Sequence, residues 1–296
     1  MTLQAILFFM EQLLYGILIG LNYSLMALGL SLIFGVMRIV NFAHGELFML
    51  GGYISYFLIT SLKIHPILAF FITVLALFIL GFAIEKSLIR PLFTENLGDE
   101  YPIIITFGLS TFLVNLAIVA FGPEFRRPPR FAPVKVNLLL WTVSGDKFYA
   151  AIIALAIIIV TYIFIRKTKT GIALQATAQD RIGAYIVGID VFKMNGLAMG
   201  IAAALAGAAG AILAPVFLLY PMCGTIPGLK GFVIIVLGGM GSIEGSIISS
   251  IILGVIESLG SVYISAPYRD VYSFLVLVAV LLFRPQGLFG VRERRV

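Results

Sequence analysis

Long apolar runs constrain this chain more than any other feature of its sequence. A helix needs about 20 predominantly apolar residues to cross the hydrocarbon core of a membrane. Eight runs are candidates for such spans, and they fall at 12–36, 46–61, 66–84, 103–121, 148–165, 197–219, 246–263 and 271–283. A ninth run, 229–240, is shorter and interrupted by glycine, so it is expected to cross only half of the membrane or to complete a ninth span. Apolar and polar residues do not alternate along these runs as they do in strands of an outer-membrane barrel. The sequence therefore predicts an all-α polytopic membrane protein with eight or nine spans.

Composition agrees with a chain whose solvent is lipid. Hydrophobic residues make up 61% of the sequence and charged residues 11%, against about 25% charged residues in soluble domains. Cys223 is the only cysteine, which argues against a disulfide framework or a cysteine-rich metal site. The first apolar run is too long for the core of a signal peptide, so it is predicted to be a retained span. We expect residues 1–296 to form one transmembrane domain.

The distribution of basic residues predicts how the chain is oriented, because cytoplasmic loops are enriched in Lys and Arg. The stretch 166–195 and the C-terminal tail hold the clearest basic groups: Arg166, Lys167, Lys169, Arg181 and Lys193, and then Arg284, Arg292, Arg294 and Arg295. Placing both inside, with nine crossings, puts the N-terminus and the 122–147 loop outside and the 37–45 and 85–102 loops inside. The net charge of +6 is then an ordinary sign of cytoplasmic loops, and no nucleic-acid partner is expected.

The sequence lacks the motifs of an energy source or a reaction centre. No Gly-Lys pair occurs, so there is no P-loop. The glycine-rich stretch 238–245 has Glu244 where a dinucleotide fingerprint needs its third glycine, and the two histidines form no H-E-x-x-H motif. Of the carboxylates near the spans, Glu257 comes closest to the mid-span charge of an ion-coupled carrier, and we interpret it as an interfacial or inter-helix hydrogen-bonding group. We expect the chain to bind no cofactor and to form a path through the membrane that another protein drives.

The longest predicted cytoplasmic segment, 166–195, contains a helical pattern over 173–187. Ile182, Tyr185, Ile186 and Ile189 recur at helical spacing, and Gly188 is expected to end the helix. Two interpretations fit this pattern. The helix lies flat against the membrane, or its exposed surface docks in a groove of a soluble partner.

The same segment resembles the coupling loop of ATP-binding-cassette (ABC) importers. It is most similar to the form found in branched-chain amino acid permeases, with an alanine-rich helix followed by Asp180, Ala184 and "GID" at 188–190. It departs from the strict Glu-Ala-Ala form of the wider importer group at 175–178, which read Gln-Ala-Thr-Ala. "YGILIGLNYSLMALGLSLIFGVMRIVNFAHGELFMLGGY" (15–53) resembles the amino-terminal signature of the LivH-type permeases. "GLKGFVIIVLGGMGSIEGSIISSIILGVIES" (228–258) and "RPQGLFG" (284–290) resemble their carboxy-terminal signature and ending.

This resemblance covers nearly the whole chain and implies an ABC importer permease fold in a bacterial inner membrane. It implies a second, related permease subunit, two ATPase subunits that bind ATP and Mg²⁺, and a periplasmic substrate-binding protein. The residues that it assigns to ATPase coupling are Gln175, Ala176, Gln179, Asp180, Arg181, Ala184 and Gly188. The candidate contacts for the binding protein are 122–147 and 220–229.

Two further clusters are candidates for the path. Asn41, His44 and Glu46 lie in "NFAHGE" between two spans, where Asn41 can cap the second helix and Glu46 suits its first turn. They form either a capped helix start or a polar network at the cytoplasmic mouth. The second cluster, Gly238, Gly239, Gly241 and Ser242, could supply unwound backbone near the midplane, as broken helices do in transporters. Small residues at 200–215, with G-x-x-x-G pairs at Gly196/Gly200 and Gly16/Gly20, indicate close packing within the chain, contact with a partner permease or the wall of a narrow path.

These observations favour the permease subunit of a binding-protein-dependent importer for branched-chain or other hydrophobic amino acids. The closest alternative is the same machine carrying urea or short amides. An ion-coupled secondary carrier or a channel would need no docking helix, and a membrane-embedded enzyme would need a convergent acid–base or metal set.

Overall fold

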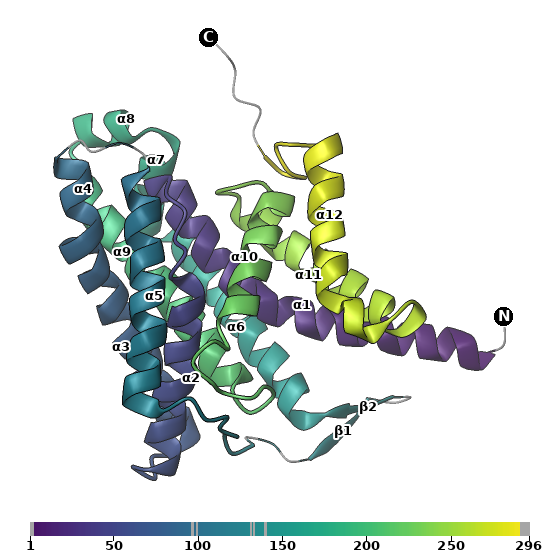
Figure 1. The fold of residues 1–296 in the computed structure, drawn as a ribbon. Coiled ribbons are helices and arrows are strands. Elements are labelled where there is room, and N and C mark those ends of the chain that lie inside the picture. The colour runs from purple at the N-terminus through teal and green to yellow at the C-terminus, as the bar shows by residue number, and fades with distance from the viewer. Residues whose placement is uncertain are drawn as a thin grey trace.

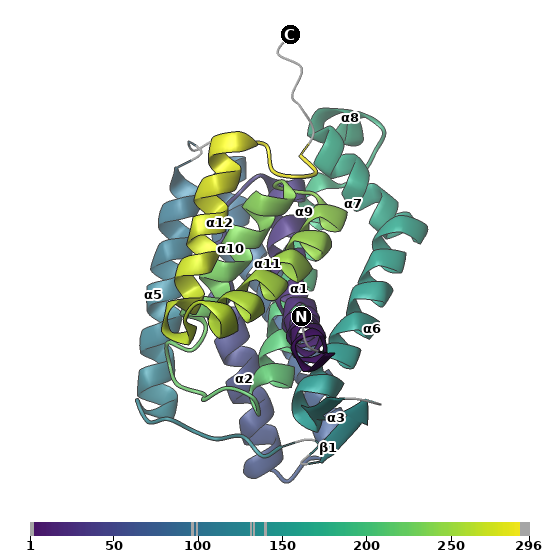
Figure 2. The ribbon, with the colours of Figure 1, turned by 90° about the vertical axis from the view of Figure 1, so that its right-hand side faces the viewer.

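The computed structural model describes residues 3–290 except 96, 97, 99, 131, 133, 139 and 140, and almost all of this part is helical (Figures 1 and 2). The longer helices are α1 (Leu3–Met37), α2 (His44–Thr60), α3 (Pro66–Ile84), α5 (Tyr101–Phe121), α6 (Gly145–Lys167), α9 (Val191–Leu213), α10 (Thr225–Gly238), α11 (Ile243–Tyr263) and α12 (Arg269–Phe283). The shorter elements are the π-helical turn η1 (Glu85–Ile89), α4 (Arg90–Thr94), α7 (Lys169–Gln179), α8 (Arg181–Ile186), the 3₁₀ turn η2 (Ala266–Tyr268), β1 (Lys135–Leu138) and β2 (Trp141–Ser144).

Seven described segments are long and apolar enough to cross a membrane: Gln4–Met37, Pro66–Thr94, Tyr101–Phe121, Gly145–Lys167, Val191–Leu213, Ile243–Tyr263 and Ala266–Phe283. The remaining two predicted spans correspond to α2, with 17 residues, and α10, with 14. Each predicted run therefore coincides with a helix, and the all-α polytopic fold is confirmed. The count of eight or nine is slightly higher than seven because it includes these two shorter helices.

The polar segments gather at two opposite ends of the bundle. The first, which we call the α8 end, holds α4, α7, α8 and the last described residues, at the top of Figure 1. The opposite end, which we call the hairpin end, holds the C-terminal end of α2 and the β1–β2 hairpin. The charge pattern predicts this grouping for the 85–102, 122–147 and 166–195 segments, but not the position of the 37–45 loop, which lies deeper in the bundle. The tail residues Arg292, Arg294 and Arg295 lie outside the described residues.

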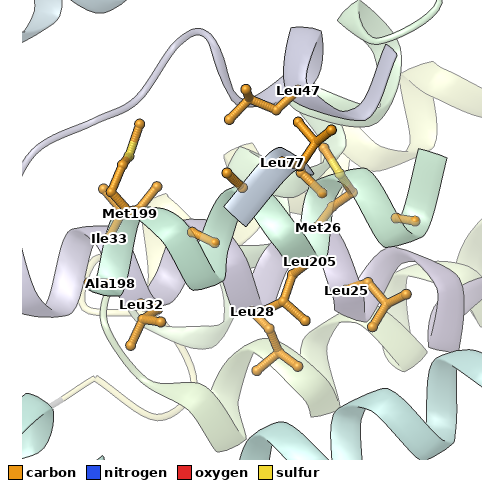
Figure 3. Close-up of a cluster of buried hydrophobic side chains, with 14 of the residues drawn as sticks. Leu25, Met26, Leu28, Leu32, Ile33, Leu47, Leu77, Ala198, Met199 and Leu205 are labelled. Atoms are coloured by element: carbon orange, nitrogen blue, oxygen red, sulfur yellow. The ribbon is translucent and has the colours of Figure 1, made fainter. Parts of the chain in front are cut away.

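The centre of the bundle is formed by α1 and α9. Their buried side chains, including Leu28, Ile33, Ala198 and Met199, form the main apolar cluster together with Leu77 of α3 (Figure 3). In Figure 2, α1 runs through the middle of the bundle, and α11 and α6 pack against it.

The small residues predicted to allow close packing do so within this chain. A Cβ atom at Gly16 or Gly20 of α1 would lie 2.6 Å from the Cα atom of Val255 or Ile251 of α11. On α9, a Cβ atom at Gly200 would lie 3.0 Å from the ring of Phe78 on α3. Of the three readings of these residues, intra-chain packing is confirmed for these positions.

The predicted 122–147 loop contains a β-hairpin that sequence reasoning missed. Val136 pairs with Val143 in the antiparallel β1–β2 register, and α6 begins at Gly145, within the predicted loop. The Trp141 indole donates a hydrogen bond to the Leu7 carbonyl (3.1 Å), which ties the hairpin to the start of α1. The predicted 220–229 loop is also shorter than expected, since α10 begins at Thr225.

Candidate functional site

The predicted helix over 173–187 is two helices, α7 and α8, with a break at Asp180. The Asp180 backbone is extended (φ −145°, ψ 105°), and its carboxylate accepts hydrogen bonds from the backbone N–H groups of Ile182 and Gly183, both at 3.0 Å. Asp is among the preferred N-cap residues because it satisfies such orphan N–H groups. The prediction of one continuous helix is therefore wrong, since Asp180 begins a new helix.

The other end of α8 is fixed by Gly188, as predicted. Gly188 has φ +86°, a left-handed conformation that glycine adopts without steric cost. Its N–H group bonds the Tyr185 carbonyl, and the Ile189 N–H group bonds the Ala184 carbonyl, both at 3.0 Å. This is the Schellman arrangement that commonly ends helices. A short helix is thus held at a defined position by both of its caps.

The surface of α8 is apolar and exposed. Ile182, Tyr185, Ile186 and Val187 are 73–75% exposed, whereas Ala184 is buried on the opposite side. Arg181 packs over the ring of Phe93 in α4, with 4.5 Å from its guanidinium carbon to the ring centroid. Four large apolar side chains on one exposed turn form a surface suited to a partner, and we call these four residues the α8 face.

The other predicted coupling residues, Gln175, Ala176 and Gln179, lie on α7. The Gln175 side chain donates a hydrogen bond to the Ile165 carbonyl (2.5 Å) and so anchors α7 to α6. The Ala176 carbonyl accepts the Asp180 N–H group (3.0 Å), and Gln179 is exposed beside the break. All seven predicted coupling residues lie in the two consecutive helices or their caps, at the α8 end.

The stretch "NFAHGE" lies deeper than predicted. Arg38 has φ +56°, and the chain turns back after α1, so that α2 begins beside the middle of α1. There the His44 Nε2 atom lies 3.2 Å from the Met26 carbonyl oxygen, and a Cβ atom at Gly29 would touch the His44 ring and the Ala202 carbonyl. Because Met26 and Ala202 are mid-helix residues, His44 lies beside the middle of α1 and α9 and not at their ends.

The three polar residues of this stretch do not form a network with one another in the described part of the chain. Asn41 Oδ1 accepts the Ala43 N–H group (3.0 Å) and closes a turn before the helix, so the prediction that Asn41 caps α2 is wrong: the helix begins at His44, with Ala43 at its N-cap position. Glu46 lies in the first turn of α2, as predicted, and is buried. The geometry favours a packed helix start over a polar network.

The cluster Gly238, Gly239, Gly241 and Ser242 forms the tight turn between α10 and α11 at the α8 end. Gly239 and Gly241 have φ +97° and +84°, which end α10 and reverse the chain. Ser242 caps α11 by accepting the Gly245 N–H group (3.1 Å). The N–H groups of Leu288 and Phe289 bond the carbonyls of Leu237 and Gly238 (2.8 and 3.0 Å), so the returning chain covers the turn. The prediction that this turn supplies unwound backbone at the midplane is wrong.

Two adjoining cavities, of about 580 and 170 Å³, lie between α1, the C-terminal end of α9 and the start of α12. The larger has an apolar wall that includes Met26, Phe48, Leu213, Phe217 and Ile226. Its polar lining includes Asn22, Lys230, Arg269 and Asp270. None of the residues of the two candidate clusters, "NFAHGE" and Gly238–Ser242, lines either cavity, but Gly210, Leu213 and Ala214 of the small-residue stretch 200–215 line the larger one.

The polar lining of the larger cavity is continuous with a buried ion network around Glu257. Glu257 has no exposed surface, and its carboxylate accepts hydrogen bonds from Tyr23 (2.9 Å), Lys230 (3.0 Å), Arg269 (2.9 Å) and Ser273 (2.5 Å). Lys230 also lies 2.9 Å from the carboxylate of Asp270. The network joins α1, α10, α11 and α12, which confirms the interpretation of Glu257 as an inter-helix hydrogen-bonding group.

Sequence reasoning missed the rest of this network, although a signal was present. Lys230 and Glu257 are isolated charges of opposite sign within apolar stretches. Because a single buried charge in a membrane helix is costly, such charges tend to pair with one another. Pairing the two by sign would have identified the centre of the network.

Cys223 provides a probe of the larger cavity, which it lines. Burial raises the pKa of the Cys223 thiol to about 11. A raised pKa leaves less of the reactive thiolate at neutral pH. We therefore expect the rate of Cys223 alkylation by iodoacetamide to rise about tenfold per pH unit from pH 7 to 10. The matched control is Leu218→Cys in a Cys223→Ser background, because Leu218 lines the same cavity but is 44% exposed. Alkylation of that thiol should level off near pH 9, and the same plateau for Cys223 would contradict the prediction.

Comparison with known proteins decides the family. Residues 12–282 match the family model described as "Branched-chain amino acid transport system / permease component". The chain belongs to this family. The permease is 35% identical to the LivH permease protein of the high-affinity branched-chain amino acid transport system of Salmonella typhimurium, over 96% of each chain. It is 31% identical to the corresponding BraD protein of Pseudomonas aeruginosa, over 95% of this chain and 96% of the relative.

A solved structure of PsaBC from Streptococcus pneumoniae in complex with Fab aligns with 95% of this permease and 97% of that chain, with 13% identity and a TM-score of 0.47. Family membership, together with the seven apolar spans, makes the chain a multi-pass membrane protein with a role in transport. As a permease component it functions with other subunits of a transport system.

Proposed function

We propose that this permease is the transmembrane subunit of a binding-protein-dependent ABC importer for branched-chain and other hydrophobic amino acids in a bacterial inner membrane. Two separate ATPase subunits bind ATP and Mg²⁺ and drive it, a second related permease pairs with it, and a periplasmic binding protein delivers substrate. The substrate class is supported by the names of the relatives, which are permeases for branched-chain amino acids.

The observation that carries the proposal is the α8 face. A helix of six residues with a cap at each end presents large apolar side chains outward at the α8 end of the bundle. A rigid apolar surface of this kind fits a groove on a soluble subunit. A helix lying in the membrane surface would need no such fixed position relative to the bundle.

Contacts of the α8 region give a route from this face to the cavity. Asp190 accepts the Lys193 N–H group (3.0 Å) and caps α9, directly after the Gly188 turn. Helix α9 packs against α1, α2 and α3, and α1, α2 and α9 all contribute residues to the larger cavity. When the ATPase subunits close on ATP, α8 moves with them. The attached helices then rock between inward and outward openings, a transition between two packed arrangements.

The α8 face can be tested by placing a charge on it. We expect Ile186→Asp to lower leucine uptake at least tenfold, because an apolar side chain at the centre of an interface is worth about 2 kcal/mol or more. The amount of permease in the membrane and its thermal stability should not change, since Ile186 is 75% exposed. The measurements are uptake by cells with the complete transporter and the yield of ATPase subunits that copurify with the tagged permease.

Leu62→Asp is the matched control, because Leu62 is 65% exposed at the hairpin end. It should leave copurification of the ATPase intact. If Ile186→Asp retained both full uptake and full copurification, the docking role of the α8 face would be refuted, and an ion-coupled carrier or channel would be favoured. Competition of labelled leucine uptake by urea and acetamide separates the amino acid importer from the alternative that carries urea or short amides.

A further inference from the structure

The larger cavity has an arrangement of charge that goes beyond a general transport path. Four ionised side chains form an alternating series beside it, Arg269, Glu257, Lys230 and Asp270, and all of them except the buried Glu257 line the cavity. The successive contacts are 2.9 Å from Arg269 to Glu257, 2.9 Å from Lys230 to Glu257, and 2.9 Å from Lys230 to Asp270. The two cations and two carboxylates cancel, so the series carries no net charge.

The inner members of the series have no capacity left for a ligand. The Lys230 ammonium has three N–H donors, and it has partners in Glu257, Tyr23 (3.1 Å) and Asp270. Glu257 is fully buried, with four side-chain partners. These two residues hold α10 to α11 and fix the positions of the outer members.

The outer members keep free capacity, and both line the cavity. Arg269 uses Nε on Glu257 and Nη2 on the Tyr23 hydroxyl (3.4 Å), and in the described part of the chain its Nη1 atom has no hydrogen-bond partner. Asp270 contacts Lys230 through Oδ1, and its side chain is 52% exposed. The cavity therefore presents an unsaturated guanidinium and an unsaturated carboxylate from consecutive residues at the start of α12.

A neutral acceptor lies in the same lining. Asn22 is 94% buried, and its amide nitrogen donates to the Leu18 carbonyl (2.7 Å). Its Oδ1 atom has no hydrogen-bond partner among the described residues. A buried acceptor without a partner is unfavourable, so an N–H donor that enters the cavity beside Asn22 would relieve that cost.

We infer that this cavity binds the zwitterionic head of an amino acid, with the α-carboxylate on Arg269, the α-ammonium on Asp270 and Asn22, and the apolar side chain against the opposite wall. Guanidinium and carboxylate groups form strong, directional charge-assisted hydrogen bonds, and the lining that includes Met26, Phe48 and Ile226 matches an aliphatic side chain. A zwitterion provides partners for both Arg269 and Asp270 at once, whereas a simple amine pairs only with Asp270 and a simple acid only with Arg269. This inference rests on the proposed function, and it adds selection of the amino acid head group by the permease itself.

The test is protection of Cys223 in washed membranes that contain the complete transporter but no soluble binding protein. Three probes share one aliphatic body: leucine, isoamylamine, which lacks the carboxylate, and 4-methylpentanoate, which lacks the ammonium. We expect leucine to slow alkylation of Cys223, and each analogue to need a concentration about 10 to 100 times higher for the same protection. Leu218→Cys in the Cys223→Ser background repeats the measurement with a more reactive thiol.

Two variants assign the ends of the zwitterion. Asp270→Asn should raise the leucine concentration for half protection about tenfold and remove the preference for leucine over 4-methylpentanoate. Arg269→Gln should remove the preference for leucine over isoamylamine. A purely structural role would weaken all three probes alike in both variants. If Arg269→Gln fails to fold, Asp270→Asn decides alone, since Asp270 is half exposed.

Two outcomes would overturn the inference. Equal protection by all three probes would mean that the cavity accepts any aliphatic molecule. If leucine protects neither cysteine in a transporter that imports leucine, the importer function would still be supported, but the head-group site would be refuted. Failure of the proposed function would be seen separately, as absence of leucine uptake by the complete transporter, whatever the protection result.

Discussion

Glu257→Gln is expected to destabilise this permease by about 3–5 kcal/mol, because removing one partner of a buried ion network leaves the others uncompensated. The amide would keep the shape of the side chain but not its charge. Lys230 would then keep only the half-exposed Asp270 as a carboxylate partner, and Arg269 would keep none within the described part of the chain. The result should be a lower unfolding temperature in detergent and less permease in the membrane at steady state.

Glu244→Gln is the matched control, since Glu244 is on the same helix, α11, and also forms an ion pair. Glu244 and its partner Arg166 are both 46% exposed, and exposed pairs contribute about 0–1 kcal/mol. A second control, Glu257→Leu combined with Lys230→Met, removes opposite charges together and should recover part of the lost stability. Equal losses in Glu257→Gln and Glu244→Gln would show that the network is not a stabilising element.

Most of the fold could be predicted because a membrane imposes a length on each apolar run. The run predicted at 103–121 is α5 (Tyr101–Phe121), and that at 66–84 is α3 (Pro66–Ile84). Helix caps could also be predicted from local sequence, since Gly188 was correctly expected to end the helix. Asp180 is likewise a preferred N-cap residue, but it was placed inside one continuous coupling helix, so the start of α8 was missed.

Depth within the bundle could not be predicted, because it depends on contacts between distant segments. The start of α2 lies beside Met26 and Ala202 because glycines let backbones meet there: a Cβ atom at Gly228 would lie 3.1 Å from the Gly45 Cα atom. The Gly239–Gly241 turn lies at the α8 end because the residues before Gly290 return to cover it. Neither contact leaves a periodic pattern in the sequence.

The candidate binding site was beyond sequence reasoning for a related reason. The Tyr23 and Glu257 side chains that meet in the network are 234 residues apart, and those of Lys230 and Tyr23 are 207 apart. Charge within apolar stretches marks Lys230 and Glu257 as unusual. It does not reveal that α12 begins beside them and brings Arg269 and Asp270 to the same cavity.

Gly20→Ala is expected to destabilise the permease by about 1–3 kcal/mol, the usual range for overpacking a tight contact. The new Cβ atom would lie 2.6 Å from the Ile251 Cα atom, and backbone cannot move aside as a flexible side chain can. Helices α1 and α11 must therefore separate at this point. The contact is mutual, because a Cβ atom at Gly254 would lie 2.6 Å from the Gly20 backbone nitrogen.

The same change should affect the cavity. Tyr23 follows Gly20 by three residues on α1, and Glu257 follows Gly254 by three residues on α11, so each lies on the same helix face as the glycine contact. Separation of the helices would lengthen the 2.9 Å hydrogen bond between Tyr23 and Glu257, so protection of Cys223 by leucine should weaken as well.

Gly108→Ala on α5 is the control, and it is expected to change the stability in the opposite direction. A Cβ atom there meets nothing within 4 Å, and alanine in a helix is favoured over glycine by about 0.5–1 kcal/mol. Unfolding temperatures of the two variants should therefore shift in opposite directions, and a stabilised Gly20→Ala permease would show that α1 and α11 can part without loss.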